Sequence, residues 1–481
     1  MHVDLTRDRD VSLPDADVCV VGAGPAGLVV ARELAERGRE VLVLESGADA
    51  PDAFADALND GDVVGDAYAG LRATRHRQVG GTMQRWNTAV AGAPGAKWVP
   101  LDPTDVDGHW PFGYDTLRPY YARAQRLCTL GPPAYDAASW TEPDRAPLPL
   151  DGSHLVSRVY QLGPRDALLA PTLQRLREVD NATLLTRATV VRLELDAGGR
   201  RVCHAVVATP DGATRQVRAR RFVLAAGAVE NARLLFLSAC GGDQVGRGFM
   251  EHPRDRAIWL RPHDARAYRR LAFYDTRVAP NGTTVLGRLA LADAALRGGA
   301  LPNASATLLP HPRASLGRLR LGGPGWTRLA APRLAFDGVT VLLNVEQRPH
   351  LDNRVVLGSR RDALGLPLPE LRWRWRAEEH ERLVRLRALV ARALAAVGVG
   401  EVRVRDDAVP DPNAHHHAGT TRMHADPRGG VVDADGRVHG TDNLYAAGAS
   451  VFPTAGFANP TLTVVALALR LAERLDSLGT R

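Results

Sequence analysis

Hydrophobic positions near the start of the chain change from one spacing to another and predict a βαβ unit. Residues 18–21 are continuously apolar, which is typical of a strand buried on both faces of a parallel sheet. A helical spacing follows over 28–37 and stops at Gly38, and a second strand-like run covers 41–45. This pattern predicts an α/β fold at the N-terminal end of the chain.

The turn inside this unit has the spacing of a dinucleotide-binding loop. Gly22 permits a tight turn, Gly24 lets the backbone approach a pyrophosphate, and Gly27 lets the helix pack closely on the strand. The N-terminus of the helix then faces the negative phosphates. Glu45 ends the second strand, where a carboxylate can accept hydrogen bonds from ribose hydroxyls. These residues predict dinucleotide binding, with FAD and NAD both open at this point.

Two later segments favour FAD. A strand expected in 218–225 and another in 443–446 each lead into a turn of small residues. Such turns bring the backbone close to a bound cofactor, and an extended FAD needs contacts from segments that are distant in sequence. The residues expected at the cofactor in these turns are Ala226, Gly227, Gly448 and Ala449.

The most specific motif lies in the last third of the chain. The run of His415, His416 and His417 is followed by 440–454 and then by the Asn-Pro-Thr-Leu-Thr run at 459–463. Together with the glycine turn, this tail resembles the glucose–methanol–choline (GMC) oxidoreductase family, and within it the pyranose oxidase and bacterial sugar or glycoside oxidoreductase branch. The resemblance is strongest over 16–47, 72–90, 217–253, 350–366 and 412–475.

This resemblance implies a fold, a cofactor and a set of site residues. The fold is a Rossmann-like FAD-binding domain with a substrate domain that contains an antiparallel sheet, as in p-hydroxybenzoate hydroxylase-like proteins. His416 corresponds to the catalytic histidine and Asn459 to its partner. Arg85 stands where pyranose oxidases often carry a flavin-linked histidine, so the FAD is expected to be noncovalent. Further cofactor contacts are implied for Gly80, Gly81, Thr82, Asn87 and Val190, the last of them at the adenine.

The chemistry of alcohol oxidation explains these residue types. An alcohol is a very weak acid, so a positioned base is needed, and histidine can take its proton near neutral pH. His416 is the expected base, with His417 as the alternative, while the Asn459 amide holds the hydroxyl and the hydride passes to flavin N5. The helix predicted from Thr461, after Pro460, directs its N-terminal dipole at the charge of the reduced flavin. His252 has either a substrate-side or a structural role.

The composition of the chain argues against nucleic-acid binding, secretion and a membrane span. The net charge is +7, from 61 basic and 54 acidic residues, and Lys97 is the only lysine. Acids are interleaved with the arginines, so nucleic-acid binding is not expected. The four cysteines form no CxxC pair. The run 415–417 could also be a metal site or a solvated loop, but no other His, Cys and Asp set has metal-ligand spacing, so a metal is not expected. The chain shows no secretory signal and no run of ~18 apolar residues, so a cytoplasmic protein without a membrane span is expected.

The hydrophobic pattern also suggests how the chain is divided. The FAD-binding domain is expected to be discontinuous, over 1–90, 155–255 and 400–481, and the substrate-binding cap to cover 91–154 and 256–399. Strands over 339–345 and 354–357 are expected in the antiparallel sheet of the cap. A long helix is expected over 377–397, ended by Gly398.

The expected activity is FAD-dependent oxidation of a secondary hydroxyl on a sugar, glycoside or cyclitol. The alternatives are oxidation of a primary alcohol of an aminosugar in antibiotic biosynthesis, a non-redox lyase that contains FAD, and a nucleotide-binding scaffold. The electron acceptor remains open among O2, a quinone and a redox protein, and the sequence does not name the substrate because its contacts come from the cap.

Overall fold

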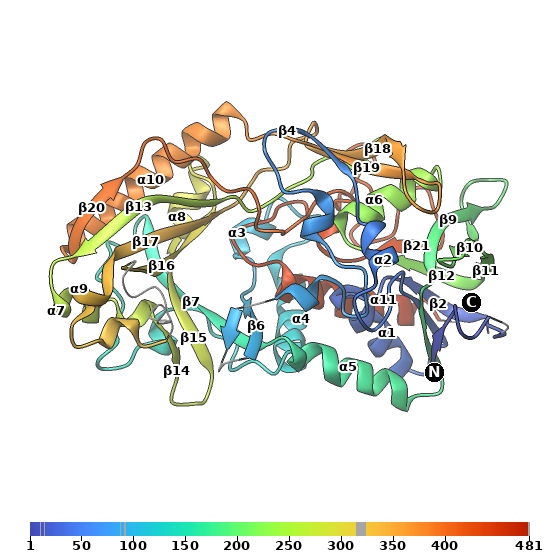
Figure 1. The fold of residues 1–481 in the computed structure, drawn as a ribbon, viewed down its shortest axis with the longest axis horizontal. Coiled ribbons are helices and arrows are strands. Elements are labelled where there is room, and N and C mark those ends of the chain that lie inside the picture. Colours follow the sequence, from blue (N-terminus) through green and yellow to red (C-terminus); the bar gives the residue numbers. More distant parts are fainter. Residues whose placement is uncertain (10, 14, 87, 91–92, 314–323, 480–481) are drawn as a thin grey trace.

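The computed structural model describes residues 1–481 except 10, 14, 87, 91–92, 314–323 and 480–481. The molecule is elongated, with two lobes side by side (Figure 1). One lobe holds both described chain ends and the helices α1, α5 and α11, and the other is formed around a large antiparallel sheet with α10. The predicted combination of an α/β cofactor lobe and an antiparallel sheet is confirmed.

The cofactor lobe is organised around six parallel strands. Their order across the sheet is β1 (His2–Asp4), β8 (Ala182–Thr186), β3 (Val41–Leu44), β2 (Ala16–Val21), β12 (Ala219–Leu224) and β21 (Leu444–Ala446). The four strands expected from their apolar runs are all present. Because every pair is parallel, the turns that follow β2, β3, β12 and β21 meet at one edge of the sheet, where α/β proteins bind ligands.

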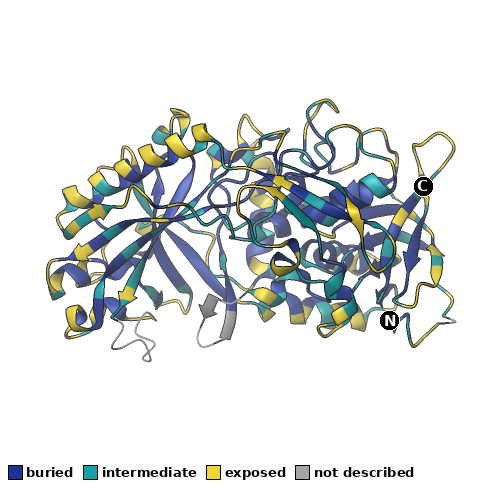
Figure 2. Ribbon diagram, turned by 45° about the horizontal axis from the view of Figure 1, so that its top comes forward, coloured by how far each residue is buried: buried dark blue, intermediate teal, exposed yellow. Residues whose placement is uncertain are grey.

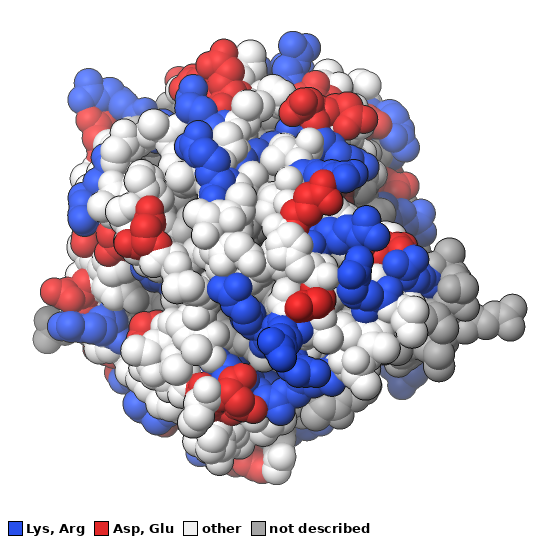
Figure 3. Space-filling model, turned by 90° about the vertical axis from the view of Figure 1, so that its left-hand side faces the viewer, with Lys and Arg blue, Asp and Glu red and all other residues white. Residues whose placement is uncertain are grey.

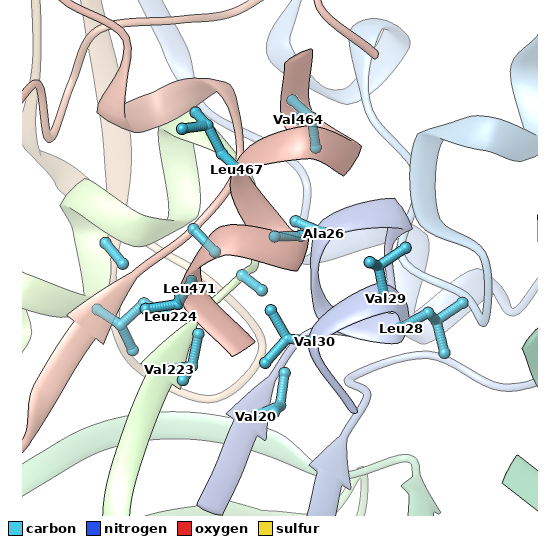
Figure 4. Close-up of a cluster of buried hydrophobic side chains, with 14 of the residues drawn as sticks. Val20, Ala26, Leu28, Val29, Val30, Val223, Leu224, Val464, Leu467 and Leu471 are labelled. Carbon is cyan, nitrogen blue, oxygen red and sulfur yellow. The ribbon is translucent and has the colours of Figure 1, made fainter. Parts of the chain in front are cut away.

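Helices cover the faces of this sheet because their apolar positions are buried there. They are α1 (Pro25–Glu36), α4 (Tyr114–Leu127), α5 (Asp166–Glu178), α6 (Ala228–Leu237) and α11 (Thr461–Ser477). Figure 4 shows Val30 of α1 and Leu471 of α11 in one cluster with Val20 and Val223 of the strands. Burying each such side chain stabilises the fold by about 1.5–3 kcal/mol. This packing fixes the N-termini of α1 and α11 at the ligand-binding edge.

The second lobe is built on a nine-stranded antiparallel sheet. Its order is β20 (Gly400–Val404), β13 (Arg254–Pro262), β17 (Phe336–Val345), β16 (Ala304–Pro312), β15 (Thr284–Leu291), β7 (Leu155–Pro164), β6 (Ala93–Trp98) and β5 (Thr88–Val90), with β14 (Thr276–Val278) beside β15. The predicted helix is α10 (Ala377–Val397), ended by Gly398 with φ +69°. Its outer side is exposed and its inner side buried (Figure 2), and a buried ion pair joins Arg387 to Asp255 at 2.7 Å.

Two small sheets complete the fold, and one of them corrects an expectation. Residues 354–357 were expected in the cap sheet, but β18 (Arg354–Arg361) pairs with β19 (Pro367–Trp373), which pairs in parallel with β4 (Asp62–Gly65). The strand is placed there because it packs on α6 of the cofactor lobe. The other sheet contains β9 (Thr189–Leu195), β10 (Val202–Ala208) and β11 (Thr214–Val217).

Short helices connect these elements, and the surface is mixed in charge. They are α2 (Ala53–Ala57), α3 (Pro103–Val106), α7 (Ala265–Arg270), α8 (Asp293–Arg297), α9 (Pro332–Ala335) and the 3-10 turns η1 (Leu71–Thr74), η2 (Gly81–Arg85), η3 (Ala138–Trp140), η4 (Ala272–Tyr274), η6 (Trp326–Arg328) and η7 (Ala449–Val451). At the cap end of the molecule, basic side chains are interspersed with acidic ones (Figure 3). Among the described residues, no helix has both the length and the apolarity to cross a membrane.

Candidate active site

A cavity of about 710 Å³ lies at the ligand-binding edge of the parallel sheet. Its wall contains the turns after β2, β3, β12 and β21 and also residues of β6, β7, β13, β16 and β17 from the antiparallel sheet. The cavity therefore lies between the two lobes. Its volume is in the range of sites that hold cofactors and small substrates, about 300–1,000 Å³.

The glycine turn after β2 has the geometry that the sequence predicts. Gly22 has φ +105°, and a Cβ there would lie 2.7 Å from the Ala225 carbonyl oxygen. A Cβ on Gly27 would lie 2.0 Å from the Gly22 carbonyl oxygen, so this glycine permits the close contact of α1 with its strand without lining the cavity. Gly24 lines the cavity and faces open space, with no heavy atom within 4 Å of its Cβ position. This combination leaves room for a pyrophosphate at the start of α1.

Glu45 is buried at the end of β3 and lines the same cavity. Its two carboxylate oxygens each accept a hydrogen bond from a backbone N–H, one from Ala23 and one from Gly47, both at 2.9 Å. Burial raises the pKa of this carboxyl, and the two N–H groups oppose that rise. A carboxylate has about four acceptor positions, so two remain for ribose hydroxyls. Val190, the expected adenine contact, also lines the wall.

An ion cluster on this wall was not predicted from the sequence. Glu230, in the first turn of α6, pairs with Arg75 and, at 2.7 Å, with Arg77, and Arg233 lies 3.4 Å away. These cations hold the pKa of Glu230 well below its usual value despite its burial. The residues are far apart in sequence, so no local signal identifies their pairing.

The turns expected at the flavin also line the cavity. Gly81, Thr82, Ala226, Gly227, Gly448, Ala449, Pro460 and Thr461 all line it. Gly80 does not, but its N–H donates to the Ala23 carbonyl at 2.8 Å, which joins the flavin segment to the dinucleotide turn. Asn87 lies outside the described residues. No side chain caps the N-terminus of α11, so its first N–H groups remain available at the cavity.

His416 and Asn459 meet in this cavity, as the sequence predicts. The Asn459 amide nitrogen lies 3.1 Å from Nε2 of His416, and both side chains line the wall. The preceding residue, His415, has φ +64°, a left-handed conformation that is uncommon for residues other than glycine. Strained backbone of this kind is found preferentially at functional sites.

A chain of hydrogen bonds assigns the protons on these histidines. Nε2 of His252 lies 2.7 Å from the Gly456 carbonyl oxygen, which only accepts, so Nε2 of His252 carries a proton. Burial lowers the pKa of His252 to about 4, so its Nδ1 is an acceptor at neutral pH. Nδ1 of His416, 3.0 Å away, must then donate to it. Nε2 of His416 is consequently unprotonated, and the Asn459 amide donates to its lone pair.

His417, the alternative base, is engaged elsewhere. Its Nε2 lies 2.8 Å from the Tyr68 hydroxyl, which also donates to Glu251 at 2.8 Å. Burial is the largest cause of both pKa shifts. It lowers the pKa of His417 to about 3 and raises the pKa of Glu251 to about 7. The other Glu251 oxygen accepts the backbone N–H of His416 at 2.7 Å. This network fixes the histidine loop and favours His416 over His417 as the base.

Glu251, His252 and His416 also have potential ligand atoms within 4.8 Å of one another. The Nδ1 atoms of His252 and His416 face each other at 3.0 Å and are joined by a hydrogen bond. The Glu251 carboxylate accepts from two backbone N–H groups and from Tyr68. Hydrogen bonds within the protein therefore already engage the groups that a metal ion would need.

The loop before Asn459 is held by the antiparallel sheet. Asn344 of β17 donates to the Phe457 carbonyl at 2.7 Å, and the Gly456 N–H donates to Glu346 at 2.8 Å. His252, which precedes β13, binds the Gly456 carbonyl. The position of the Asn459 amide therefore depends on both lobes.

The sequence did not identify the residues that the antiparallel sheet presents to the cavity. They are Lys97, Tyr160, Arg254, Thr307, Leu342 and Asn344, each on a strand. Alternation along a strand indicates which positions share a face, but it does not indicate which face meets the cofactor lobe. The one available signal was that Lys97 is the only lysine of the chain.

Comparisons with known proteins agree with this geometry. Residues 17–250 match the family model described as FAD dependent oxidoreductase, and 349–468 match the one described as GMC oxidoreductase. Paromamine 6'-oxidase of Streptomyces fradiae is 29% identical over 97% of this chain and 92% of its own length. The 6'''-hydroxyparomomycin C oxidase of Streptomyces lividus is 26% identical over 96% of this chain and 91% of its own length. A C-glycoside 3-oxidase of Arthrobacter globiformis is 37% identical over 28% of this chain and 25% of its own length.

Solved structures show the same fold. Pyridoxine 4-oxidase from Mesorbium loti aligns with a TM-score of 0.58 at 20% identity, over 96% of this chain and 99% of that one. A formate oxidase aligns with a TM-score of 0.60 at 18% identity, over 98% of this chain and 99% of that one. The chain belongs to the GMC oxidoreductase family. It is an FAD-dependent oxidoreductase, and the glycine turn, Glu45 and the two helix N-termini fit that cofactor.

Proposed function

We propose that this enzyme oxidises a secondary hydroxyl of a sugar, glycoside or cyclitol. The observation that carries the proposal is the unprotonated Nε2 of His416, 3.1 Å from the Asn459 amide in the cavity wall. A substrate hydroxyl that replaces this direct hydrogen bond would donate to Nε2 of His416 and accept from the Asn459 amide. The glycoside 3-oxidase among the relatives supports the choice of a secondary hydroxyl.

The residues of this chain perform the proton half of the reaction. His416 takes the hydroxyl proton on Nε2, while the Asn459 amide stabilises the negative charge that develops on the oxygen. Glu251 accepts the backbone N–H of His416 at 2.7 Å and so holds the backbone that carries the base in place. FAD, when bound, supplies the hydride acceptor at flavin N5.

His252 has a positioning role in this scheme, because it sets the tautomer of His416. His252→Leu removes the acceptor for the Nδ1 proton, so the rate of flavin reduction by substrate should fall roughly 10- to 100-fold. His252→Asn retains an acceptor oxygen and should restore most of the rate. FAD content and thermal unfolding should be measured for both variants. Equal rates in the Leu variant and the wild type would contradict the tautomer assignment.

The pH profile provides a readout that a purely structural role would not change. Burial and the charges of His252 and Arg254 lower the pKa of His416 well below 6.5. A base with a lowered pKa stays neutral as the pH falls through 6.5, so the wild-type rate should hold there and decline only at lower pH. In His252→Leu the decline should begin at a different pH. A wild-type decline centred at 6.5 would contradict the burial argument.

A second candidate is oxidation of a primary alcohol of an aminosugar. Two relatives over nearly the full chain, named for paromamine and 6'''-hydroxyparomomycin C, favour it. A catalytically inactive scaffold is a weaker candidate, because it needs no base beside an amide in the cavity. A non-redox lyase could use the same base, so it is separated by whether the flavin is reduced.

Anaerobic reduction of the flavin tests the proposal. The purified holoenzyme is mixed with neutral sugars, glycosides, cyclitols and aminosugars, and absorbance of the oxidised flavin is followed. Bleaching by a compound with a free secondary hydroxyl, and none by its derivative blocked at that hydroxyl, is expected. Product formation without bleaching would indicate a lyase. Adding O2, a quinone or a redox dye to the reduced enzyme then separates an oxidase, which forms peroxide, from a dehydrogenase.

A further inference from the structure

The antiparallel-sheet side of the cavity carries positive charge without a carboxylate. Lys97 and Arg254 line that side, and the described lining residues there include no acid. The two carboxylates in the wall are Glu45, at the end of β3, and Glu230, which is already paired with arginines. The positive charge on this side of the wall is therefore not balanced by a carboxylate among the described lining residues.

Lys97 is directed into this space by its strand. It lies opposite Leu162 in the pairing of β6 with β7, and so shares a face with Tyr160, two positions along. Its Nζ is 5.7 Å from the Tyr160 ring centroid. Burial lowers the pKa of Lys97, and the positive charges of Arg254 and Arg288 lower it further.

Arg288 adds a third cation behind the wall. It is fully buried on β15, and its guanidinium lies 4.3 Å from the Tyr160 ring centroid and 3.8 Å from that of Phe457. Within the described part of the chain its side-chain nitrogens have no hydrogen-bond partner. Asp102, whose charge acts on Arg288, is already paired with Arg158. Phe457 is close in sequence to Asn459, so this positive region adjoins the proton-accepting pair.

Arg254 connects the region to the reaction. One of its terminal nitrogens donates to the Asn413 carbonyl, Asp411 lies 3.8 Å away, and its Nε has no partner among the described residues. Its charge acts on both Lys97 and His416. Arg254, Lys97 and His416 all line the same cavity.

Lys97 faces no carboxylate among the described residues of this wall. Arg254, 33% exposed and 3.8 Å from Asp411, has an Nε without a hydrogen-bond partner among the same residues, so a ligand that supplies negative charge would stabilise both cations. The cofactor phosphates do not fill this role, because their site is the glycine turn at the parallel sheet. We propose that the substrate is an anionic sugar or glycoside, whose carboxylate or phosphate binds Lys97 and Arg254 while its hydroxyl lies at His416 and Asn459. This inference rests on the proposed function and opposes the aminosugar candidate, because a cationic substrate would be repelled from the same wall.

Substitution of Lys97 tests the inference on the holoenzyme. Lys97→Met keeps the length of the side chain and removes its charge, and Lys97→Arg keeps the charge. The probes are methyl glucuronide (carboxylate), glucose 6-phosphate (phosphate), methyl glucoside (neutral) and paromamine (cationic), with flavin bleaching as the readout. Lys97→Met should raise the KM of the preferred anionic probe about 10- to 100-fold, and Lys97→Arg should change it much less.

The control is methyl glucoside, whose KM should change less than about threefold in Lys97→Met. An equal loss for neutral and anionic probes, with a changed flavin midpoint potential, would assign Lys97 to the flavin and overturn the inference. Preference for paromamine over both anionic probes would also overturn it, yet leave oxidation at His416 intact. Absence of bleaching by every sugar would instead contradict the proposed function, and the inference with it.

Discussion

Replacing His416 by alanine should lower the rate of flavin reduction by substrate about 10²- to 10⁴-fold, the usual contribution of a general base. The protein should keep its yellow colour, because no predicted cofactor contact is lost. The reason for the loss is specific: Nε2 of His416 is the acceptor that the tautomer of His252 leaves unprotonated. Stopped-flow reduction under anaerobic conditions, with FAD content measured in parallel, gives the rate.

His415→Asn is the matched control for this variant. It alters the neighbouring cavity-lining histidine, and asparagine tolerates the φ of +64° found there. Its rate should fall far less than that of His416→Ala. Unchanged reduction in His416→Ala, or a larger loss in His415→Asn, would refute the assignment of the base.

Gly24→Val should abolish retention of FAD while leaving the protein folded. Gly24 has φ −79°, and no heavy atom lies within 4 Å of its Cβ position, so the apoprotein accommodates the new side chain. The same space is where the pyrophosphate must approach the backbone. FAD content should fall more than tenfold, with the melting temperature of the apoprotein within about 2 °C of the flavin-free wild type.

The control for the glycine is Gly70→Val, which also meets no heavy atom within 4 Å and lies exposed outside the cavity wall. It should retain full FAD. Cofactor content is read after acid denaturation, which should release free FAD, because Arg85 cannot form the histidine link. Full FAD occupancy in Gly24→Val would contradict the assignment of the pyrophosphate site to this turn. Flavin that stays attached to the protein after acid denaturation would contradict noncovalent binding.

The cofactor lobe was largely predictable because its signals are local. The apolar run of β2, the glycine spacing and the helical pattern of α1 fall within a few turns of chain, and each dictates its own conformation. His416 and Asn459 were recognised from their motifs, although no sequence rule gives the 3.1 Å between them.

The cap was less predictable because its contacts are made between distant segments. The placement of 354–357 depends on pairing with β19 and on packing against α6, and neither is visible in the strand itself. Lys97 and Arg254 line the cavity because of the way the antiparallel sheet packs against the cofactor lobe, which the sequence of either strand does not show. The role of His252 depends on a carbonyl at Gly456, far along the chain. How the chain divides into the expected cofactor and cap domains remains a prediction.

The tethering of the 456–459 loop has a consequence for protein engineering. Asn344 and Glu346 hold this loop from the antiparallel sheet, His252 binds it just before β13, and the asparagine at its end contacts His416. A chimera that grafts a relative's cap onto this FAD lobe would therefore misplace the amide unless these three anchors travel with the graft. Specificity and chemistry in this enzyme cannot be exchanged as separate modules.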